Sequence, residues 1–380
     1  MKPCRSVALF GAPLLVSCSL LGCGGDFTSP PPCSATCPQP KPEFLYATAL
    51  NQVLAFTVDP TTGTLTQSAT VAGPNDPGGM AVDPSSDFLY VSDFGNTGSS
   101  AVDAFSIAPT TGALAAVNGS PFAAGNALGG LAIDPAGKSL YVTQINDDSV
   151  VALSRNGTTG VLTSVTGSPF PASTGPAGAA VDPSGKFLYV SDYNDSQGAI
   201  SAYAIGPSGA LTPVAGSPFP TQASGGPSSL VAHPSGKFLY VGLAGTVNAN
   251  HVIAAFSIDG TSGALTPLAG SPFPAGMDPL HITLDPAGKF LFAANVQDDT
   301  ISGFTINDSN GALTQVAGSP FATASSLAGI VVDRAGTFLY AASTIGITTF
   351  SINSSTGTLG NVTTLKTADA PQFLAIVQTK

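Results

Sequence analysis

Residues 177–192 read Ala-Gly-Ala-Ala-Val-Asp-Pro-Ser-Gly-Lys-Phe-Leu-Tyr-Val-Ser-Asp, and close variants of this stretch recur along the 380-residue chain. The Phe-Leu-Tyr core, or a one-residue variant of it, occurs seven times at intervals of 44 to 52 residues. Its third positions are Tyr46, Tyr90, Tyr141, Tyr189, Tyr240, Phe292 and Tyr340. A repeat of this length is one supersecondary unit, and units of four short strands at this period are typical of propeller blades. The sequence therefore predicts an all-β, seven-bladed β-propeller.

Each repeat contains four short apolar runs, which we interpret as the four antiparallel strands of a blade. The runs are rich in Val, Ile, Leu, Tyr and Thr and are separated by Pro, Gly, Asn and Asp, as in a β-meander. Asp182-Pro-Ser-Gly-Lys is a typical turn between the first two strands, in which Asp accepts a backbone N–H. Gly209 has the position of a hairpin glycine between the third and fourth strands. No part of the chain beyond the N-terminal segment shows a sustained helical period.

The motif Gly-Ser-Pro-Phe is expected to end the fourth, outermost strand in five repeats. It begins at Gly119, Gly167, Gly216, Gly270 and Gly318. Proline lacks a backbone N–H, so at this position it prevents edge pairing with another molecule. The sequence therefore predicts a monomer.

The two ends of the propeller, residues 44–380, are predicted to complete one blade. The first repeat has no strand before its Phe-Leu-Tyr, whereas the chain ends with an unassigned apolar run at 371–377. Placed beside residues 44–72, this run completes the first blade and closes the ring.

The N-terminal segment is typical of an exported protein. Lys2 and Arg5 precede a short apolar run at 6–21, which fits a signal peptide of residues 1–22. The sequence Leu-Leu-Gly-Cys ending at Cys23 resembles the lipobox of bacterial lipoproteins. This implies a lipid anchor at Cys23 and a location at the bacterial outer membrane, on its periplasmic or surface face. The alternative is an ordinary signal peptide with an incidental cysteine.

Residues 23–43 are rich in Pro, Gly and Ser and are predicted to form a tether. Cys33 and Cys37 lie in it, and whether they form a disulfide stays open. The chain carries a formal net charge of −11, and loss of Lys2 and Arg5 with the signal peptide makes it more negative. This balance argues against nucleic acid and against charge-driven binding to anionic lipids, so the membrane is contacted through the anchor only.

The repeats resemble those of the seven-bladed propeller lactonase family, which includes 6-phosphogluconolactonases and carboxy-muconate cyclases. The resemblance covers roughly residues 44–378 and rests on the motif Asp-Pro-x-Gly-Lys-Phe-Leu-Tyr-Val. It implies a propeller fold and, as an activity, hydrolysis of a lactone. The motif defines the blade and leaves the chemistry to be argued from other residues.

The sixth repeat holds the residues that match the family's functional pattern. Family members commonly carry a histidine at the start of a blade's first strand and an acidic residue after the second, as His281 and Asp299 do here. The first strand lies innermost, so His281 is expected near the mouth of the central channel. In a lactonase His281 would be the general base towards water, and Asp299 would orient it. Alternatively, His281 is a polar residue that only satisfies loop carbonyl groups.

Most other repeats place a small residue where the sixth has His281. Ser229 and Gln372 are the polar ones, so His281, Ser229 and Gln372 are the candidate ligand-binding residues. The remaining positions are Gly79, Gly130, Gly178 and Gly329.

Two observations weigh against the family's chemistry. The resemblance implies arginine, histidine and glutamate in the channel, but the predicted propeller has no glutamate, and its arginines, Arg155 and Arg334, belong to turns on the opposite rim. A phosphorylated sugar lactone requires clustered cations, and none is expected beside His281. The sequence thus favours a binding or scaffolding protein for an unidentified small molecule or protein, with lactone hydrolysis as the rival hypothesis.

A third hypothesis is calcium-dependent recognition through acidic loops between the second and third strands. Aspartates gather there on the His281 rim, and carboxylate oxygen is the ligand type that Ca²⁺ prefers. Turn formation is the simpler interpretation, and no other cofactor or metal is predicted. The acids are Asp93, Asp147, Asp148, Asp192, Asp195, Asp298 and Asp299.

Overall fold

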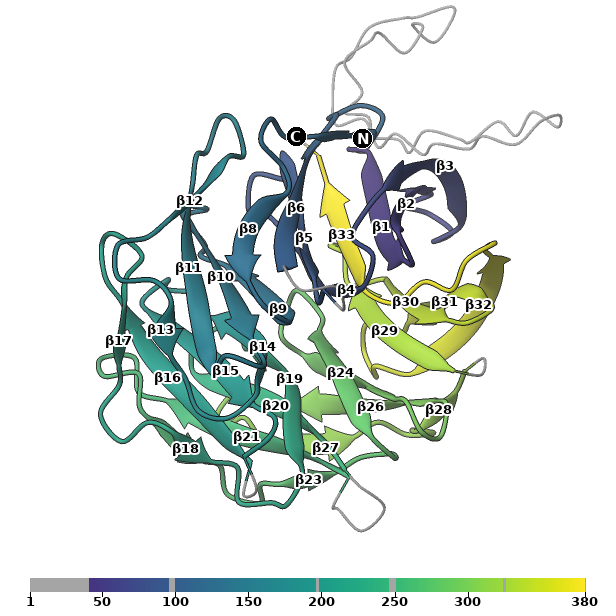
Figure 1. Cartoon of the computed structure of the whole chain (residues 1–380). Helices are drawn as coiled ribbons and strands as arrows, with labels where there is room; N and C mark the ends of the chain where they lie inside the picture. The colour runs from purple at the N-terminus through teal and green to yellow at the C-terminus, as the bar shows by residue number, and fades with distance from the viewer. Residues whose placement is uncertain (1–40, 96–99, 196–197, 246–250, 324–325, 380) are drawn as a thin grey trace, which may run out of the picture. The chain divides into compact units, whose positions relative to one another are not determined.

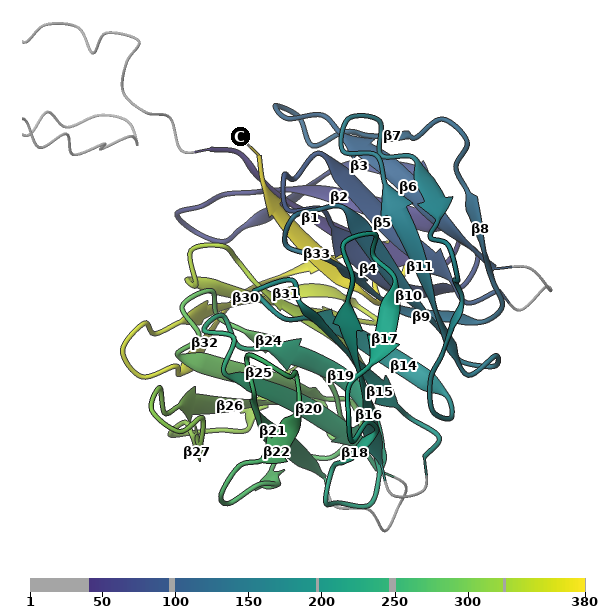
Figure 2. The ribbon, with the colours of Figure 1, turned by 90° about the vertical axis from the view of Figure 1, so that its left-hand side faces the viewer.

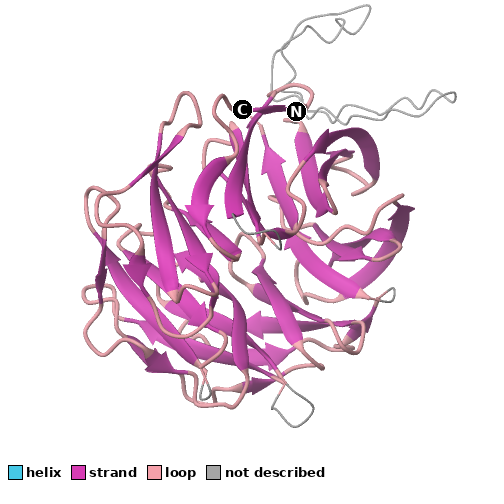
Figure 3. Ribbon diagram, viewed as in Figure 1, coloured by secondary structure: helices cyan, strands magenta, loops and turns pink. Residues whose placement is uncertain are grey.

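The computed structural model describes residues 41–95, 100–195, 198–245, 251–323 and 326–379, which belong to one compact unit. The expected signal peptide, the lipidated Cys23, and Cys33 and Cys37 lie outside the described residues. All regular secondary structure in the described ranges is β-strand (Figure 3). Within those ranges there is no helix long and apolar enough to cross a membrane.

The described residues form seven antiparallel sheets arranged radially around a central axis (Figures 1 and 2). Blade 1 contains β33 (Leu374–Gln378), β1 (Glu43–Ala49), β2 (Gln52–Val58) and β3 (Leu65–Ala72). Blade 2 contains β4 (Pro77–Val82), β5 (Phe88–Asp93), β6 (Ser100–Ile107), β7 (Leu114–Ala116) and β8 (Phe122–Gly125). Blade 3 contains β9 (Leu128–Ile133), β10 (Ser139–Gln144), β11 (Ser149–Arg155), β12 (Leu162–Ser164) and β13 (Phe170–Pro171). The seven-bladed prediction is therefore confirmed.

The other four blades repeat this order from the channel outwards. Blade 4 contains β14 (Pro176–Val181), β15 (Phe187–Asp192), β16 (Ala199–Ile205), β17 (Leu211–Pro213) and β18 (Phe219–Pro220). Blade 5 contains β19 (Gly226–Ala232), β20 (Phe238–Ala244), β21 (Val252–Ile258), β22 (Leu265–Pro267) and β23 (Phe273–Pro274). Blade 6 contains β24 (Pro279–Leu284), β25 (Phe290–Asn295), β26 (Thr300–Ile306), β27 (Leu313–Gln315) and β28 (Phe321–Ala322). Blade 7 contains β29 (Leu327–Val332), β30 (Phe338–Ser343), β31 (Gly346–Ile352) and β32 (Leu359–Lys366).

The C-terminal strand closes the ring, as the sequence predicts. β33 pairs with β1 in antiparallel register, with Val377 opposite Phe44 and Leu374 opposite Ala47. Each inner strand also contacts the inner strands on both sides, in the cyclic order β33, β4, β9, β14, β19, β24 and β29. In the closed ring every blade packs between two neighbouring blades, and propellers keep their exposed strand edges short in this way.

The Phe-Leu-Tyr repeat is explained by contacts between neighbouring blades. The Tyr189 hydroxyl donates a hydrogen bond to the Gly263 carbonyl in the hairpin of the next blade, at 3.0 Å. The Phe187 ring packs against the same glycine, whose φ of 77° requires a residue without a side chain. Tyr46, Tyr90, Tyr141 and Tyr240 make the equivalent bond. The tyrosine of the motif therefore joins each of blades 1 to 5 to the next blade.

The Gly-Ser-Pro-Phe motif does not end the outer strand, which corrects the prediction. In blades 2 to 6 it separates two short segments, such as β17 and β18, that both pair with the third strand, here β16. The Ser217–Pro218 bond between them is cis. The Ser217 hydroxyl accepts the Ala202 N–H of the third strand at 2.9 Å, a donor that the broken edge leaves without a backbone partner. Five blades thus have a divided outer strand.

The ring has two rims that differ in the connections they carry. We call upper the rim that carries the connections from second to third strands and from each outer strand to the next inner strand. We call lower the opposite rim, which carries the two tight hairpins of each blade. At the lower rim Asp182 accepts the Lys186 and Phe187 N–H groups at 2.8 Å, as expected for the turn. Glu43, assigned to the tether from sequence, is the buried first residue of β1 at this rim.

Candidate functional site

A cavity of about 450 Å³ lies at the upper mouth of the channel. The inner strands of blades 2 to 6 line it, together with Phe94 and Ile145, which follow the second strands of blades 2 and 3. Apolar side chains predominate: Met80, Phe94, Leu131, Ile145, Leu230, Leu280 and Phe373. Among the described residues lining it, Asp76 and His281 are the ionisable ones, and none is Lys or Arg.

A β-bulge places His281 in this cavity. Pro279 pairs with Asn295 while His281 pairs with Ala294, so β24 has one residue more than its partner at this point. Bulges bend the strand and redirect its side chains, and they are frequent at barrel rims and binding sites. The predicted location of His281 at the channel mouth is thus what the structure has.

The His281 imidazole is held neutral by its surroundings. Burial lowers its pKa to about 4, because an apolar environment disfavours the charged ring. No described residue makes a hydrogen bond to either ring nitrogen, and the ring meets the edge of Phe373, with 5.5 Å between centroids. Among the described residues, therefore, His281 does not donate a hydrogen bond to a loop carbonyl group. A neutral imidazole has one N–H donor and one acceptor for a ligand.

Close packing of the inner strands explains the small residues at equivalent positions. A Cβ at Gly178 would collide with the Ser228 carbonyl oxygen of the next blade, and one at Gly329 would collide with that of Gln372. Ser229 fits because its hydroxyl accepts the Ile282 N–H, at 3.4 Å, next to His281. Ser229 and His281 therefore lie together in the cavity wall.

Gln372 does not occupy the position assigned to it. The Thr48 N–H donates to the Phe373 carbonyl at 3.0 Å, which makes Phe373 the partner of Thr48 and the equivalent of His281. Gln372 instead donates its backbone N–H to the Thr48 carbonyl and is not among the cavity-lining residues. The reason is the pairing register: Leu374 lies opposite Ala47, so the residue before it, Phe373, comes opposite Thr48.

Asp299 lies on the upper rim but interacts with the next blade rather than with His281. Its carboxylate accepts the Leu327 N–H at 3.1 Å, at the start of β29. Its backbone carbonyl accepts the Thr323 N–H at 3.0 Å. Asp299 is not among the residues lining the cavity, and these contacts fix where the chain enters blade 7.

The other acids of the upper rim mostly hold loops together. Asp298 accepts the Met277 N–H at 2.9 Å, Asp148 the Gly175 N–H at 2.8 Å, and Asp93 the Gly95 N–H at 3.0 Å. Among the described residues there is no group of three or more His, Cys, Asp or Glu arranged to hold a metal ion. Calcium recognition stays a prediction without a specific geometric support.

The strongly basic side chains are engaged at the lower rim. Arg155 is buried, forms an ion pair with Asp83 at 3.4 Å and donates to the Gly137 carbonyl at 2.6 Å. The Arg334 guanidinium donates to the Ser86 hydroxyl at 3.4 Å, and its backbone N–H donates to the Glu43 carboxylate at 3.2 Å. Neither arginine lines the channel cavity, as the sequence predicts.

The apolar lining residues are the part of the site that the sequence did not predict. Phe94 and Ile145 stand directly after the repeated second strands, and this fixed place in the repeat is the signal that could have found them. Phe373 could be found only from the pairing register of β33 with β1.

Comparisons with known proteins agree with this geometry. The family model described as lactonase, 7-bladed beta-propeller, matches residues 45–128 and 217–324. No curated protein sequence matches the chain. A putative 6-phosphogluconolactonase from Bacteroides uniformis superposes with a TM-score of 0.78 and 21% identity over 89% of this chain and 100% of that one. A periplasmic gluconolactonase from Pseudomonas aeruginosa superposes with a TM-score of 0.75 and 17% identity over 89% and 100%.

Proposed function

This chain belongs to the seven-bladed β-propeller lactonase family, and we propose that it binds an uncharged small molecule at the channel mouth. One observation carries the proposal: the neutral His281 ring, without a hydrogen-bond partner among the described residues, faces a cavity of apolar side chains. Cavities of this size with a few convergent polar groups are typical small-molecule sites. The expected ligand contains a carbonyl or hydroxyl group that pairs with the imidazole.

The electrostatics of the cavity argue against a phosphorylated ligand. Binding phosphate requires Arg or Lys in direct contact, and the lining residues provide neither. The carboxylates of the upper rim also repel anions that approach the channel. In this respect the chain differs from what is expected of a 6-phosphogluconolactonase, the activity for which the Bacteroides uniformis neighbour is named.

Isothermal titration with paired neutral and phosphorylated sugar lactones tests the proposal. We expect binding of a neutral member that weakens about tenfold in His281→Ala, because a buried ligand group then lacks its partner. His281→Gln, which keeps a neutral donor and acceptor, should recover part of the affinity. His251→Ala is the matched control, since it removes an imidazole outside the cavity. Equal affinity of wild type and His281→Ala for every ligand would exclude this site.

Lactone hydrolysis with His281 as general base is the second candidate, and family membership favours it. A base of pKa about 4 is unprotonated at neutral pH and so accepts a proton from water, but weakly. The rate should rise through about pH 4 and then level off, and Asp299→Asn should leave it nearly unchanged because Asp299 bonds to Leu327. Hydrolysis as fast in His281→Ala as in wild type would rule out this role.

We also propose that Cys23 carries a lipid that anchors the propeller to the bacterial outer membrane through the tether. The lipobox-like sequence ending at Cys23 supports this proposal. Metabolic labelling with a fatty acid should mark the wild-type protein and leave Cys23→Ala unlabelled. Equal labelling of both, or wild-type protein recovered free of membranes, would contradict it.

A further inference from the structure

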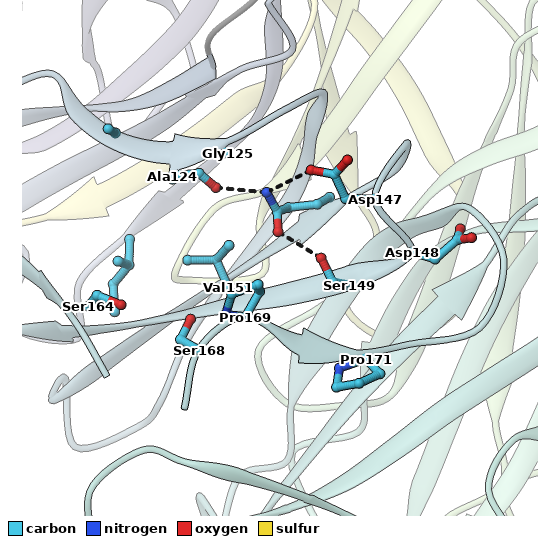
Figure 4. A pocket seen from close by; sticks show the side chains of 13 residues that line it. Ala124, Gly125, Asp147, Asp148, Ser149, Val151, Ser164, Ser168, Pro169 and Pro171 are labelled. Atoms are coloured by element: carbon cyan, nitrogen blue, oxygen red, sulfur yellow. Dashed lines mark hydrogen bonds between the residues drawn. The ribbon is translucent and has the colours of Figure 1, made fainter. Parts of the chain in front are cut away.

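A second cavity, separate from the channel, opens between blades 2 and 3 (Figure 4). It has a volume of about 600 Å³, within the range of small-molecule sites. Blade 2 contributes the segment around β8, and blade 3 contributes the upper part of β11 with the loop before it. The lining residues are Ala123, Ala124, Gly125, Gln144, Asp147, Asp148, Ser149, Val151, Leu153, Ser164, Ser168, Pro169 and Pro171.

The other blades provide an internal comparison for this cavity. In each blade one side chain of the third strand, in register with the leucine of Phe-Leu-Tyr, is buried against the preceding blade. In six blades it is aromatic, and in blade 3 it is Leu153. The six aromatic residues are Phe56, Phe105, Tyr203, Phe256, Phe304 and Phe350. Blade 3 therefore lacks an aromatic ring at the boundary where the cavity opens.

The neighbouring boundary shows how a ring is held at this position. Tyr203 of blade 4 is buried against blade 3, and its hydroxyl donates to the Pro171 carbonyl of β13 at 2.6 Å. Ala123 of β8 is the equivalent of Pro171 one blade earlier, and it lines the cavity. An aromatic ring from outside the chain would lie beside Leu153, with Ala123 where the neighbouring boundary has Pro171.

Carboxylates stand at the entrance to the cavity. Asp147 and Asp148 are exposed, and none of the described lining residues is Lys, Arg or His. Asp148 accepts the Gly175 N–H at 2.8 Å, whereas the contacts of Asp147 with Asn126 and Gln144 are long, at 3.4 Å. The Gln144 amide oxygen accepts the hydroxyl of Ser149 at 2.7 Å, and Figure 4 labels Ser149 and Asp147 on this side of the cavity. Asp147 is thus the carboxylate available to a cation.

We propose that this cavity is a binding site for an aromatic amine in its protonated form. The ring lies against Leu153 and Val151, where the other blades supply their own aromatic ring, and the ammonium group pairs with Asp147. Apolar burial of the ring supplies the affinity, and the carboxylate supplies the preference for cations over anions.

Tryptamine is a suitable probe because the chain contains no tryptophan, so indole emission reports the ligand alone. We expect anisotropy of the probe to rise on binding, with indole binding more weakly and indole-3-acetate weakest. Leu153→Phe restores the side chain of the other blades and should fold. It should lower tryptamine affinity by about tenfold, because the ring position is then filled.

Two further variants separate this site from the channel. Asp147→Asn should lower affinity for tryptamine about two- to fivefold and leave indole unchanged, as expected for one exposed charge pair. His281→Ala should leave tryptamine affinity unchanged, because His281 lines the other cavity. No anisotropy change at millimolar protein, equal affinity in Leu153→Phe, or loss of binding in His281→Ala would each overturn the proposal.

Discussion

Removing the hydroxyl oxygen should lower stability at one of two equivalent tyrosines and not at the other. Tyr189 and Tyr340 are both fully buried third residues of the Phe-Leu-Tyr repeat. The Tyr189 hydroxyl donates to the Gly263 carbonyl at 3.0 Å. The Tyr340 hydroxyl has no hydrogen-bond partner among the described residues, and the equivalent carbonyl of Gly63 accepts the Thr349 hydroxyl at 3.3 Å.

The magnitudes follow from the cost of unpaired polar groups. Tyr189→Phe removes one hydrogen bond and leaves the Gly263 carbonyl without it, which should lower the free energy of unfolding by about 1–3 kcal/mol. Tyr340→Phe removes a buried hydroxyl that forms no bond, so stability should stay equal or rise by up to about 1 kcal/mol. The sixth blade already carries phenylalanine, Phe292, at this position.

Urea unfolding followed by circular dichroism measures both variants against the wild type. The midpoint should shift down for Tyr189→Phe and not for Tyr340→Phe, with the same slope in all three proteins. A loss in Tyr340→Phe as large as that in Tyr189→Phe would refute the view that the tyrosine acts through the bond between blades.

Three other perturbations have defined outcomes. Burial raises the pKa of Asp192 to about 7, so the protonated carboxyl group stabilises the fold below about pH 4, and this contribution is lost as the pH rises to 7. Asp192→Asn should therefore match the stability of the wild type at pH 4. At pH 8 the variant should be more stable than the wild type by at most about 4 kcal/mol. Thermal melts at the two pH values decide this, and equal differences would contradict it. Ending the chain at Pro371 removes β33 and should abolish a single cooperative transition in calorimetry, whereas a truncated protein that melts like the full chain would disprove closure by this strand. Asp83→Asn leaves the buried Arg155 charge uncompensated and should cost about 3–5 kcal/mol in urea unfolding; a loss under about 1 kcal/mol would mean that water reaches the guanidinium.

The fold was predictable because the sequence of each repeat contains the residues that form its turns. The aspartate at Asp182 and the hairpin glycine at Gly209 act on bonds within a few residues, so their roles can be read without tertiary knowledge. Their recurrence in successive repeats then fixed the number of blades. Closure by the C-terminal run could be predicted because the first repeat lacked its innermost strand, and the apolar run at 371–377 belonged to no repeat.

The parts that escaped prediction depend on contacts between distant segments. The pairing of β33 with β1 decides that Phe373, and not Gln372, matches His281. The division of the outer strand depends on the Ser217 hydroxyl replacing a backbone partner of Ala202. The burial of Glu43 depends on a turn almost three hundred residues later, where it accepts the Arg334 N–H.

The candidate site could be predicted only in part from the sequence, because it too depends on contacts between distant segments. His281 stands out because it breaks the series of small residues, and the repeats themselves supply the comparison. Part of the apolar lining was less accessible, because Phe94 and Ile145 follow the second strands and Phe373 depends on the register of β33 with β1. The cavity beside Leu153 could have been noticed in an alignment of the repeats, since it lies where a repeated aromatic position is lost.

Nuclear magnetic resonance of labelled histidine side chains tests the central claim most directly, because the chain contains only three histidines. We predict that the His281 imidazole stays neutral until about pH 4 and that its nitrogen shifts change when a neutral lactone is added. A His281 that titrates near 6.5, or whose resonances ignore every neutral ligand, would contradict a half-buried imidazole that lacks a hydrogen-bond partner until a ligand enters the channel.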